Sequence, residues 1–123
     1  MRQQYHIRQV GEDTHVWDVN RLLRLHANVP TQAVALSQIA EIQQAYWFPN
    51  THPSTADIVE HMRLVEAADL AYPILMDAEG KLMDGMHRVA QALRLGHTHI
   101  LAVRFVDTPA PDYVGVAPAD LPY

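Results

Sequence analysis

The stretch from Tyr72 to Val106 restricts the fold more than any other part of the chain. Two short apolar runs, YPILMD and KLMD, flank a turn containing Gly80, which is the pattern of a β-hairpin. From Met86 to Leu95 the apolar residues instead follow helical spacing, and Gly96 stands where a left-handed helix terminator is expected. Residues 100–106, ILAVRFV, have the pattern of a buried strand. This segment predicts an α+β fold with a small mixed sheet flanked by helices.

The N-terminal quarter predicts one strand and one helix. Residues 5–10, YHIRQV, alternate weakly and indicate a short strand or an ordered arm. Between Trp17 and His26 the apolar residues follow helical spacing, with Asp18 as the expected N-cap and Pro30 beyond the helix end.

The middle of the chain predicts a strand and a capped helix. Val34 and Leu36 alternate as in a short strand. Ser37 is the expected cap of a helical stretch that carries Glu41 and ends near Tyr46. Its apolar residues Ile39, Ile42 and Tyr46 share one face.

A second helix is predicted after the loop NTHPST. Ser54 and Asp57 have the spacing of a capping box, and the helix should run from about residue 55 to 69. Helical spacing places its more polar residues, including Glu60 and Arg63, on the wetter side. The buried stripe is expected to consist of Ile58, Met62 and Val65.

Length and composition indicate one domain. A chain of 123 residues forms a single core, which we assign to residues 1–107, with a proline-rich tail over 108–123 that packs on it. No apolar run approaches the length that spans a bilayer, so we expect no membrane association and a cytoplasmic location. The chain has no cysteine, which excludes thiol catalysis.

The net charge of −5 argues against strong duplex DNA binding by this chain alone, because that binding depends on Lys and Arg neutralising phosphates. The sequence leaves open whether the chain is a monomer or a homodimer.

The segment Asp84-Gly85-Met86-His87-Arg88 lies where the strand is expected to give way to the helix. Asp84 is placed to cap the helix and Gly85 to allow a sharp turn. The positive end of a helix disfavours cations, yet His87 and Arg88 fall in its first turn. A bound anion, phosphate first, explains such a pair. The alternative is that Arg88 pairs with a protein acid, such as Asp84, while His87 packs as a neutral residue.

The segment PILMDAEGKLMDGMHRVAQALRLGHTHILAVRF resembles the ParB/sulfiredoxin superfamily, whose members place a G-x-x-R or D-G-x-H-R element between a β-hairpin and a helix. With VALSQI and the helix over 55–69, the resemblance covers about residues 34–106. Small bacterial ParB-like proteins with a similar YWF segment and a proline-rich ending look closest. The resemblance implies that Gly85, Met86, His87 and Arg88 hold nucleotide phosphates, and that Asp84 orients Arg88 or approaches a metal.

The branches of the superfamily imply different activities. Sulfiredoxin works through a cysteine in GCHR, and Met86 occupies that position here. The partition ParB proteins bind CTP and add a DNA-reading helix-turn-helix module, for which this chain shows no segment. The free-serine kinase branch uses DGHHR with ADP or ATP and is the nearest enzymatic precedent. The resemblance thus implies a nucleotide ligand, ATP, ADP or CTP, with or without Mg²⁺.

The function is therefore expected to be binding of a nucleotide or phosphorylated small molecule, with an ATP- or ADP-dependent phosphotransferase as its enzymatic form. Arg88 and the helix N-terminus would neutralise charge, and His87 would help to position the donor, with Asp84 as a further catalytic residue. Glu41 is the expected general base, against the alternative of a solvated helix glutamate. The rival is a non-catalytic ligand- or partner-binding module of a DNA-associated system.

Other residues carry weaker signals. His97 and His99 are two apart, as two metal ligands on a strand could be, but no third ligand accompanies them, so no metal site is predicted. Trp47 and its aromatic neighbours could stack on a base or belong to the core. His52 and His61 could be either polar residues around a loop or part of the cleft, and the sequence does not decide between these roles.

Overall fold

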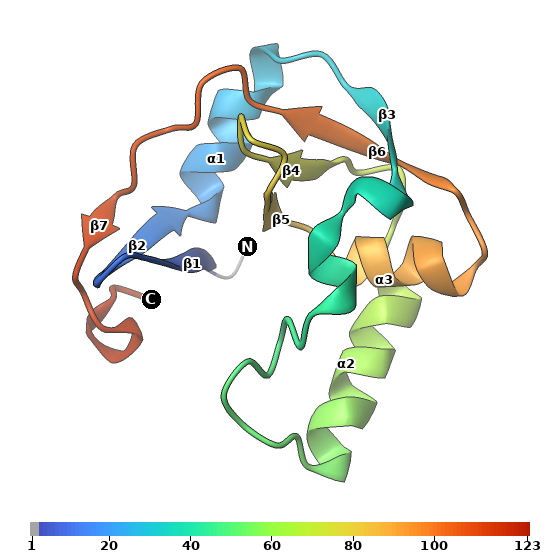
Figure 1. The fold of residues 1–123 in the computed structure, drawn as a ribbon, viewed down its shortest axis with the longest axis horizontal. Helices are drawn as coiled ribbons and strands as arrows, with labels where there is room; N and C mark the ends of the chain where they lie inside the picture. The colour runs from blue at the N-terminus through green and yellow to red at the C-terminus, as the bar shows by residue number, and fades with distance from the viewer. Residues whose placement is uncertain (1–2) are drawn as a thin grey trace.

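The computed structural model describes residues 3–123 and has the form of a small mixed α+β domain with two sheets and three helices (Figure 1). The helices are α1 (Val19–Leu25), α2 (Thr55–Ala67) and α3 (Met86–Arg94). The strands are β1 (Tyr5–Val10), β2 (Asp13–Asp18), β3 (Gln32–Ala35), β4 (Ile74–Met76), β5 (Leu82–Asp84), β6 (His99–Arg104) and β7 (Tyr113–Val114). The expected mixed sheet is therefore accompanied by a second, smaller sheet.

The larger sheet has the strand order β3-β6-β4-β5 and contains the segment that most restricted the fold. β4 and β5 pair antiparallel, while β4 and β6 run parallel and are connected through β5 and α3. The hairpin turn is held by Asp77, whose carboxylate accepts hydrogen bonds from the N–H groups of Glu79 and Lys81. The predicted hairpin, helix and following strand are confirmed, as is the left-handed conformation of Gly96.

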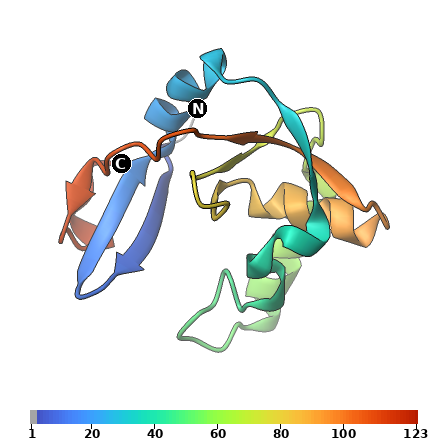
Figure 2. The same cartoon turned by 45° about the horizontal axis from the view of Figure 1, so that its top comes forward.

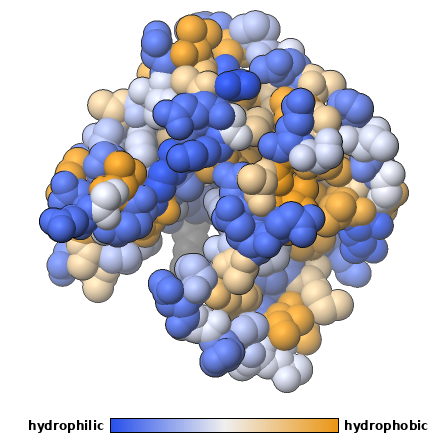
Figure 3. Space-filling model, viewed as in Figure 1, coloured by the Kyte–Doolittle hydropathy of each residue, from blue (hydrophilic) through white to orange (hydrophobic). Residues whose placement is uncertain are grey.

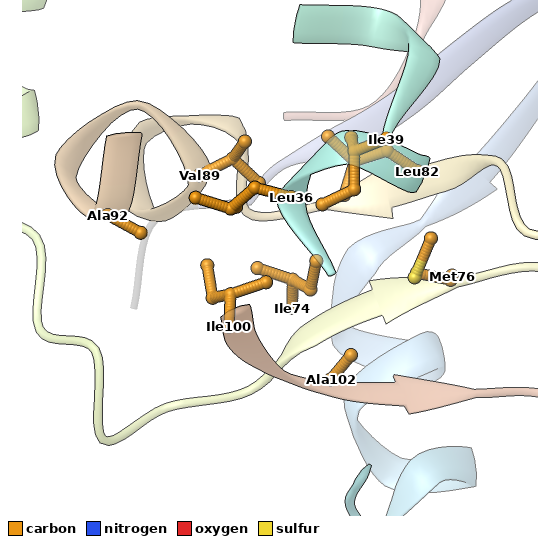
Figure 4. Packing of buried hydrophobic residues seen from close by; sticks show 9 residues of the cluster. All are labelled: Leu36, Ile39, Ile74, Met76, Leu82, Val89, Ala92, Ile100 and Ala102. Carbon is orange, nitrogen blue, oxygen red and sulfur yellow. The ribbon is translucent and has the colours of Figure 1, made fainter. Parts of the chain in front are cut away.

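Both faces of this sheet are covered, because its strand residues alternate between two clusters. Ile74 and Leu82 point into one cluster, and Leu75 and Met83 into the other. The first cluster packs between the sheet, α3 and the segment that carries Leu36 and Ile39 (Figure 4). It comprises Leu36, Ile39, Ile74, Met76, Leu82, Val89, Ala92, Ile100 and Ala102. The second, which involves β2 and α1, comprises Trp17, Leu22, Leu75, Met83, Val103 and Phe105.

The smaller sheet has the order β1-β2-β7. The predicted strand over residues 5–10 is confirmed, but it belongs to a hairpin whose second strand, β2, was not predicted. The predicted helix is confirmed as α1, which begins at Val19, while Trp17 just before it pairs with His6 across this hairpin. Asp18 is the N-cap, as predicted, and accepts a hydrogen bond from the N–H of Asn20.

The predicted helix after Ser37 is wrong. The chain forms two short 3₁₀ turns, Leu36–Gln38 and Ala40–Gln43, and no side chain caps either of them. Leu36 and Ile39 are both buried in the first cluster. Their burial outweighs the local helical period, so tertiary packing overrides propensity here.

Helix α2 begins as predicted but is buried differently. Ser54 and Asp57 form the capping box. The expected buried stripe is wrong, because Ile58 is 48% and Met62 is 59% exposed, and only Val65 is buried. Helix α2 packs against α3, and its first two turns extend beyond the region that α3 covers (Figure 1). The apolar residues do share one face of α2, but no described helix or strand covers that face at Ile58 and Met62.

The proline-rich tail runs back along the N-terminal hairpin. Its strand β7 pairs with β2, and the Trp17 indole Nε1 donates a 2.7 Å hydrogen bond to the carbonyl of Pro109. Leu121 is buried, and the Tyr5 and Tyr123 rings meet edge to face. No helix among residues 3–123 is long and apolar enough to cross a membrane.

Candidate functional site

A cleft of about 950 Å³ lies between the N-terminal part of the molecule and the two helices α2 and α3. One wall comes from β1 and α1, and the other from the end of α2, the loop around Trp47 and residues 83–88. The ribbon shows these parts on opposite sides of an opening (Figure 2), and the space-filling view shows a hollow there with a mainly hydrophilic rim (Figure 3). The five motif residues, Asp84 to Arg88, all line this cleft.

Gly85 is the N-cap of α3 and has a φ of +106°. A Cβ at this position would lie 2.8 Å from Ile74 Cγ2 and 2.8 Å from Arg88 Nη2, so the site has no room for a larger residue. The expectation that Asp84 caps α3 is wrong, because no side chain accepts a hydrogen bond at this helix start. The sharp turn expected at Gly85 is confirmed, and it leaves the N–H groups of the first turn of α3 without a side-chain cap.

Arg88 pairs with Asp84 across this turn. Its Nη2 atom donates a 2.9 Å hydrogen bond to Asp84 Oδ2, and both side chains are mostly buried. This is the contact expected from the alternative in which Arg88 pairs with a protein acid. It occupies one guanidinium nitrogen, and Nε and Nη1 of Arg88 make no hydrogen bond to residues 3–123. The pair therefore fixes the guanidinium at the cleft wall without using all of its donors.

His87 bonds to a histidine that lies far from it in the sequence. Its Nε2 atom lies 2.8 Å from Nδ1 of His61 on α2, and the indole of Trp47 lies parallel to both imidazoles. Burial lowers the pKa of His87, and the nearby His61 and Arg88 lower it further. A neutral imidazole at position 87 agrees with the alternative considered for this residue.

The structure does not bring Glu41 into the cleft. Its carboxylate accepts a 2.7 Å hydrogen bond from the N–H of Leu82, at the start of β5. Glu41 therefore ties the 3₁₀ segment to the edge strand β5, a contact that differs from both the expected general base and the alternative of a solvated glutamate. Tyr46 lines the cleft, and burial raises its pKa, with Glu41 and Asp84 adding to the effect.

Met86 has two surroundings. It lines the cleft and is also packed against the first hydrophobic cluster. It is the first residue of α3, so its main chain belongs to the helix start while its side chain packs on the cluster. Met86 thus contributes backbone, and no titrating side chain, to the site.

His97 and His99 do not form a metal centre with a third residue. Residues 3–123 contain no group of three or more His, Cys, Asp or Glu side chains placed to hold a metal ion. His99 is exposed on β6, and its Nδ1 atom lies 2.9 Å from the hydroxyl of Thr98.

His6 is a cleft-lining residue that the sequence did not single out. Burial lowers its pKa to about 4, and the Arg8 guanidinium adds to the effect while Asp77 opposes it. Its Nε2 atom is the one buried side-chain nitrogen or oxygen within residues 3–123 that lacks a hydrogen-bond partner. A lone histidine in a weakly alternating strand does not indicate a cleft-lining position. The cleft depends on the fold, which places β1 opposite residues more than 70 positions away in the sequence.

Searches with family models, against curated proteins and against solved structures find no match to this chain.

Proposed function

We propose that this chain binds a phosphorylated small molecule, a nucleotide foremost, with its phosphate at the start of α3. One observation carries the proposal. Helix α3 begins without a side-chain cap, and that end lines a cleft of about 950 Å³ beside the half-buried Arg88. Ligand pockets commonly fall between about 300 and 1,000 Å³, so the cleft is large enough for a nucleotide.

Three features of the helix start would favour a phosphate. The first-turn N–H groups and the helix dipole favour an anion at this end of α3. Arg88 adds a permanent charge, and its ion pair with Asp84 keeps the guanidinium in place before the ligand arrives. Gly85 allows close approach, because it presents no side chain.

Aromatic rings would hold the remainder of the ligand. Tyr46, Trp47 and Tyr72 all line the cleft, and each offers a face on which a base can stack. Stacking accepts any base, so we propose ATP, ADP and CTP alike as ligands. We include in the proposal that the chain belongs to the ParB/sulfiredoxin superfamily, and the order of hairpin, motif, helix and strand supports this. A cytoplasmic location is also part of the proposal.

The enzymatic form of the proposal is phosphoryl transfer to a small acceptor. Because Glu41 does not line the cleft, the proposal names no proton acceptor, and His87, which lines the cleft and whose pKa is lowered by burial first and then by its neighbours, helps to position the donor phosphate. The described residues do not offer a protein-held Mg²⁺ site, since Asp84 is paired with Arg88, so no step of the proposal runs through a metal.

A second candidate follows from the ion pair itself. If the bond between Asp84 and Arg88 serves the fold alone, the chain is a non-catalytic ligand- or partner-binding module of a DNA-associated system. With a net charge of −5, such a module would not bind duplex DNA strongly by itself. Arg88 would then matter for the unliganded protein and not for any phosphate ligand.

A thermal-shift screen with ATP, ADP, CTP, GTP and inorganic phosphate, each with and without Mg²⁺, tests the proposal. A ligand that binds the native state raises Tm by mass action, and saturation at 100 times Kd adds about 2.7 kcal/mol. At least one phosphorylated compound is expected to raise Tm, and the matching nucleoside is not. If none of these compounds raises Tm at millimolar concentration, the binding proposal is wrong.

A further inference from the structure

His61 and His87 lie between two cavities. His87 lines the large cleft, whereas His61 lines an apolar groove of about 220 Å³ on the other side, with Phe48, Ile58 and Met62. Trp47 borders both cavities. The imidazole pair therefore connects the proposed phosphate site to a separate part of the surface.

The two imidazoles meet edge to edge. Their ring centroids are 5.0 Å apart and their planes differ by 21°, while the two nitrogens lie 2.8 Å apart. Rings stacked face to face could not bring two nitrogens so close. The contact is therefore an N–H···N hydrogen bond in which one nitrogen, Nδ1 of His61 or Nε2 of His87, carries the proton.

The outer nitrogens of the pair are accessible. Nδ1 of His87 and Nε2 of His61 make no hydrogen bond to residues 3–123. Neither is among the buried atoms that lack a partner, a condition found within these residues only for Nε2 of His6. Solvent therefore reaches both ends of the pair, and a proton can enter at either end.

The pair can accept one proton readily but not two. After the first proton, one ring is an imidazolium and the N–H···N hydrogen bond is kept, now with charge assistance. A second proton would place two N–H groups and two positive charges against each other at this distance. Such coupled groups titrate as a unit, in two separated steps.

Aromatic rings cover the singly protonated pair. The Trp47 ring centroid lies 4.5 Å from that of His61 and 4.7 Å from that of His87, with nearly parallel planes. An indole face attracts a cation lying against it. Phe48 meets His61 edge to face, so the loop before α2 adds no charge of its own at these contacts.

Charged groups approach the pair from both helices and from β5. Asp57 lies one turn before His61 on α2 and interacts with it electrostatically. Arg88 follows His87 on α3 and disfavours a positive charge there, but Asp84 at the end of β5 is paired with it. Without a ligand these influences oppose one another. A phosphate dianion beside Arg88 would shift the balance toward the protonated pair.

We propose that His61 and His87 act as one proton-exchanging unit, which takes up a proton from solvent when a phosphate dianion binds in the cleft. The proton adds to an outer nitrogen, the hydrogen bond between the rings persists, and the charge of the pair rises from zero to +1. His61 is the positioning residue that lets His87 share this charge. The inference rests on the proposed function for its ligand, but the pairing itself can be tested without one.

The first test follows the imidazole Cε1–H signals of the unliganded protein by NMR as pH falls. Both signals of the pair are expected to show the same two steps, because each proton is shared. In His61→Gln, His87 should titrate in a single step. If His87 titrates in one step in the wild type and His61→Gln leaves its curve unchanged, the two rings are not a unit and the inference is wrong.

The second test is calorimetric titration with ADP near pH 7.5, in buffers of different ionisation enthalpy. The terminal phosphate is then almost entirely a dianion, since its second pKa is about 6. We expect net proton uptake on ADP binding, lost in His61→Gln. His99→Gln is the matched control, because His99 is exposed on β6, does not line the cleft and bonds to no other imidazole, and it should keep the uptake.

The outcomes separate the two proposals. ADP binding without proton uptake, or uptake that survives in His61→Gln, overturns the inference and leaves the proposed function standing. No heat with ADP or inorganic phosphate, together with coupled titration of the two rings, contradicts the proposed function and the ligand-linked uptake while supporting the paired unit.

Discussion

Gly85 combines a positive φ with the absence of space for a side chain, and these two properties can be separated by experiment. Gly85→Ala is expected to lower the free energy of unfolding by about 2 to 4 kcal/mol, through backbone strain and through a collision with Ile74. Gly96→Ala is the matched control, since Gly96 has a φ of +77° with nothing within 4 Å of the added atom. It should cost about 1 to 2 kcal/mol.

Urea denaturation of both variants measures the difference. Equal costs for Gly85→Ala and Gly96→Ala would mean that the tight contact at the start of α3 contributes nothing, and that close packing is not what requires a glycine there.

His6 makes stability depend on pH. Its pKa falls from an ordinary value of 6.5 to about 4 in the folded protein, mainly because of burial. Between these two values the unfolded chain binds the proton and the folded protein does not, so stability is fully present above about pH 6.5 and declines toward pH 4. The loss amounts to roughly 3 kcal/mol.

Replacing His6 with phenylalanine tests this assignment. His6→Phe should be as stable as the wild type at neutral pH or more stable, because an unpaired buried nitrogen is removed. Its unfolding free energy should fall less between pH 6.5 and 4. If the free energies of unfolding of the two proteins fall in parallel across this pH range, another group is responsible.

Among the elements, α2 is the helix whose pattern and burial disagree. Val65→Ala is expected to cost about 1 to 3 kcal/mol, because Val65 is buried. Met62→Ala should change the free energy of unfolding by about 0.5 kcal/mol or less, because more than half of Met62 is exposed. Chemical denaturation of the two variants decides. A cost of several kcal/mol for Met62→Ala would mean that its helix face is covered in solution.

The elements predicted correctly from the sequence are those whose signals are local. The hairpin from Ile74 to Asp84 has two apolar runs and a glycine turn, and α3 ends at a glycine in the left-handed region. The capping box of Ser54 and Asp57 likewise needs only neighbouring residues. Such features form within a few residues, so the sequence contains the whole interaction.

The failures arise where distant contacts decide. Strand β2 was not predicted, because it forms by pairing with β1 and with the tail strand β7. Ile39 is drawn into the core, which replaces the expected helix with 3₁₀ turns. The candidate site follows the same rule, since the turn at Gly85 was predictable, whereas the bond between His61 and His87 joins residues 26 apart.

At the scale of the whole molecule, the cleft depends on how the N-terminal sheet is attached. Arg8 on β1 forms a 2.8 Å ion pair with Asp77, which is buried in the turn of the β4–β5 hairpin. Burial alone would raise the pKa of Asp77, but hydrogen bonds from Lys81 and Arg8 outweigh it and the pKa is lowered. The tail strand β7 pairs with β2 in the N-terminal sheet. Residues from both ends of the chain thus hold the wall opposite the motif.

The central claim is that the start of α3 binds phosphate in this cleft, and two variants separate it from a purely structural ion pair. Arg88→Ala removes a charge-assisted contact to phosphate and should weaken ADP binding by about one to two decades in Kd. Asp84→Asn breaks the same ion pair but keeps the guanidinium and removes a negative charge, so it should bind ADP at least as well as the wild type. If the pair serves the fold alone, both variants lose stability and neither changes the Kd.

The most direct measurement is titration of the ¹⁵N-labelled protein with ADP and with inorganic phosphate, followed through the backbone amide signals. A phosphate site at the start of α3 should give saturable shifts concentrated at Gly85, Met86, His87 and Arg88 with both ligands, with further shifts near Trp47 for ADP alone. Arg88→Ala should require much higher concentrations for the same shifts. Amide signals of residues 85–88 that remain unmoved at millimolar phosphate and ADP would contradict it.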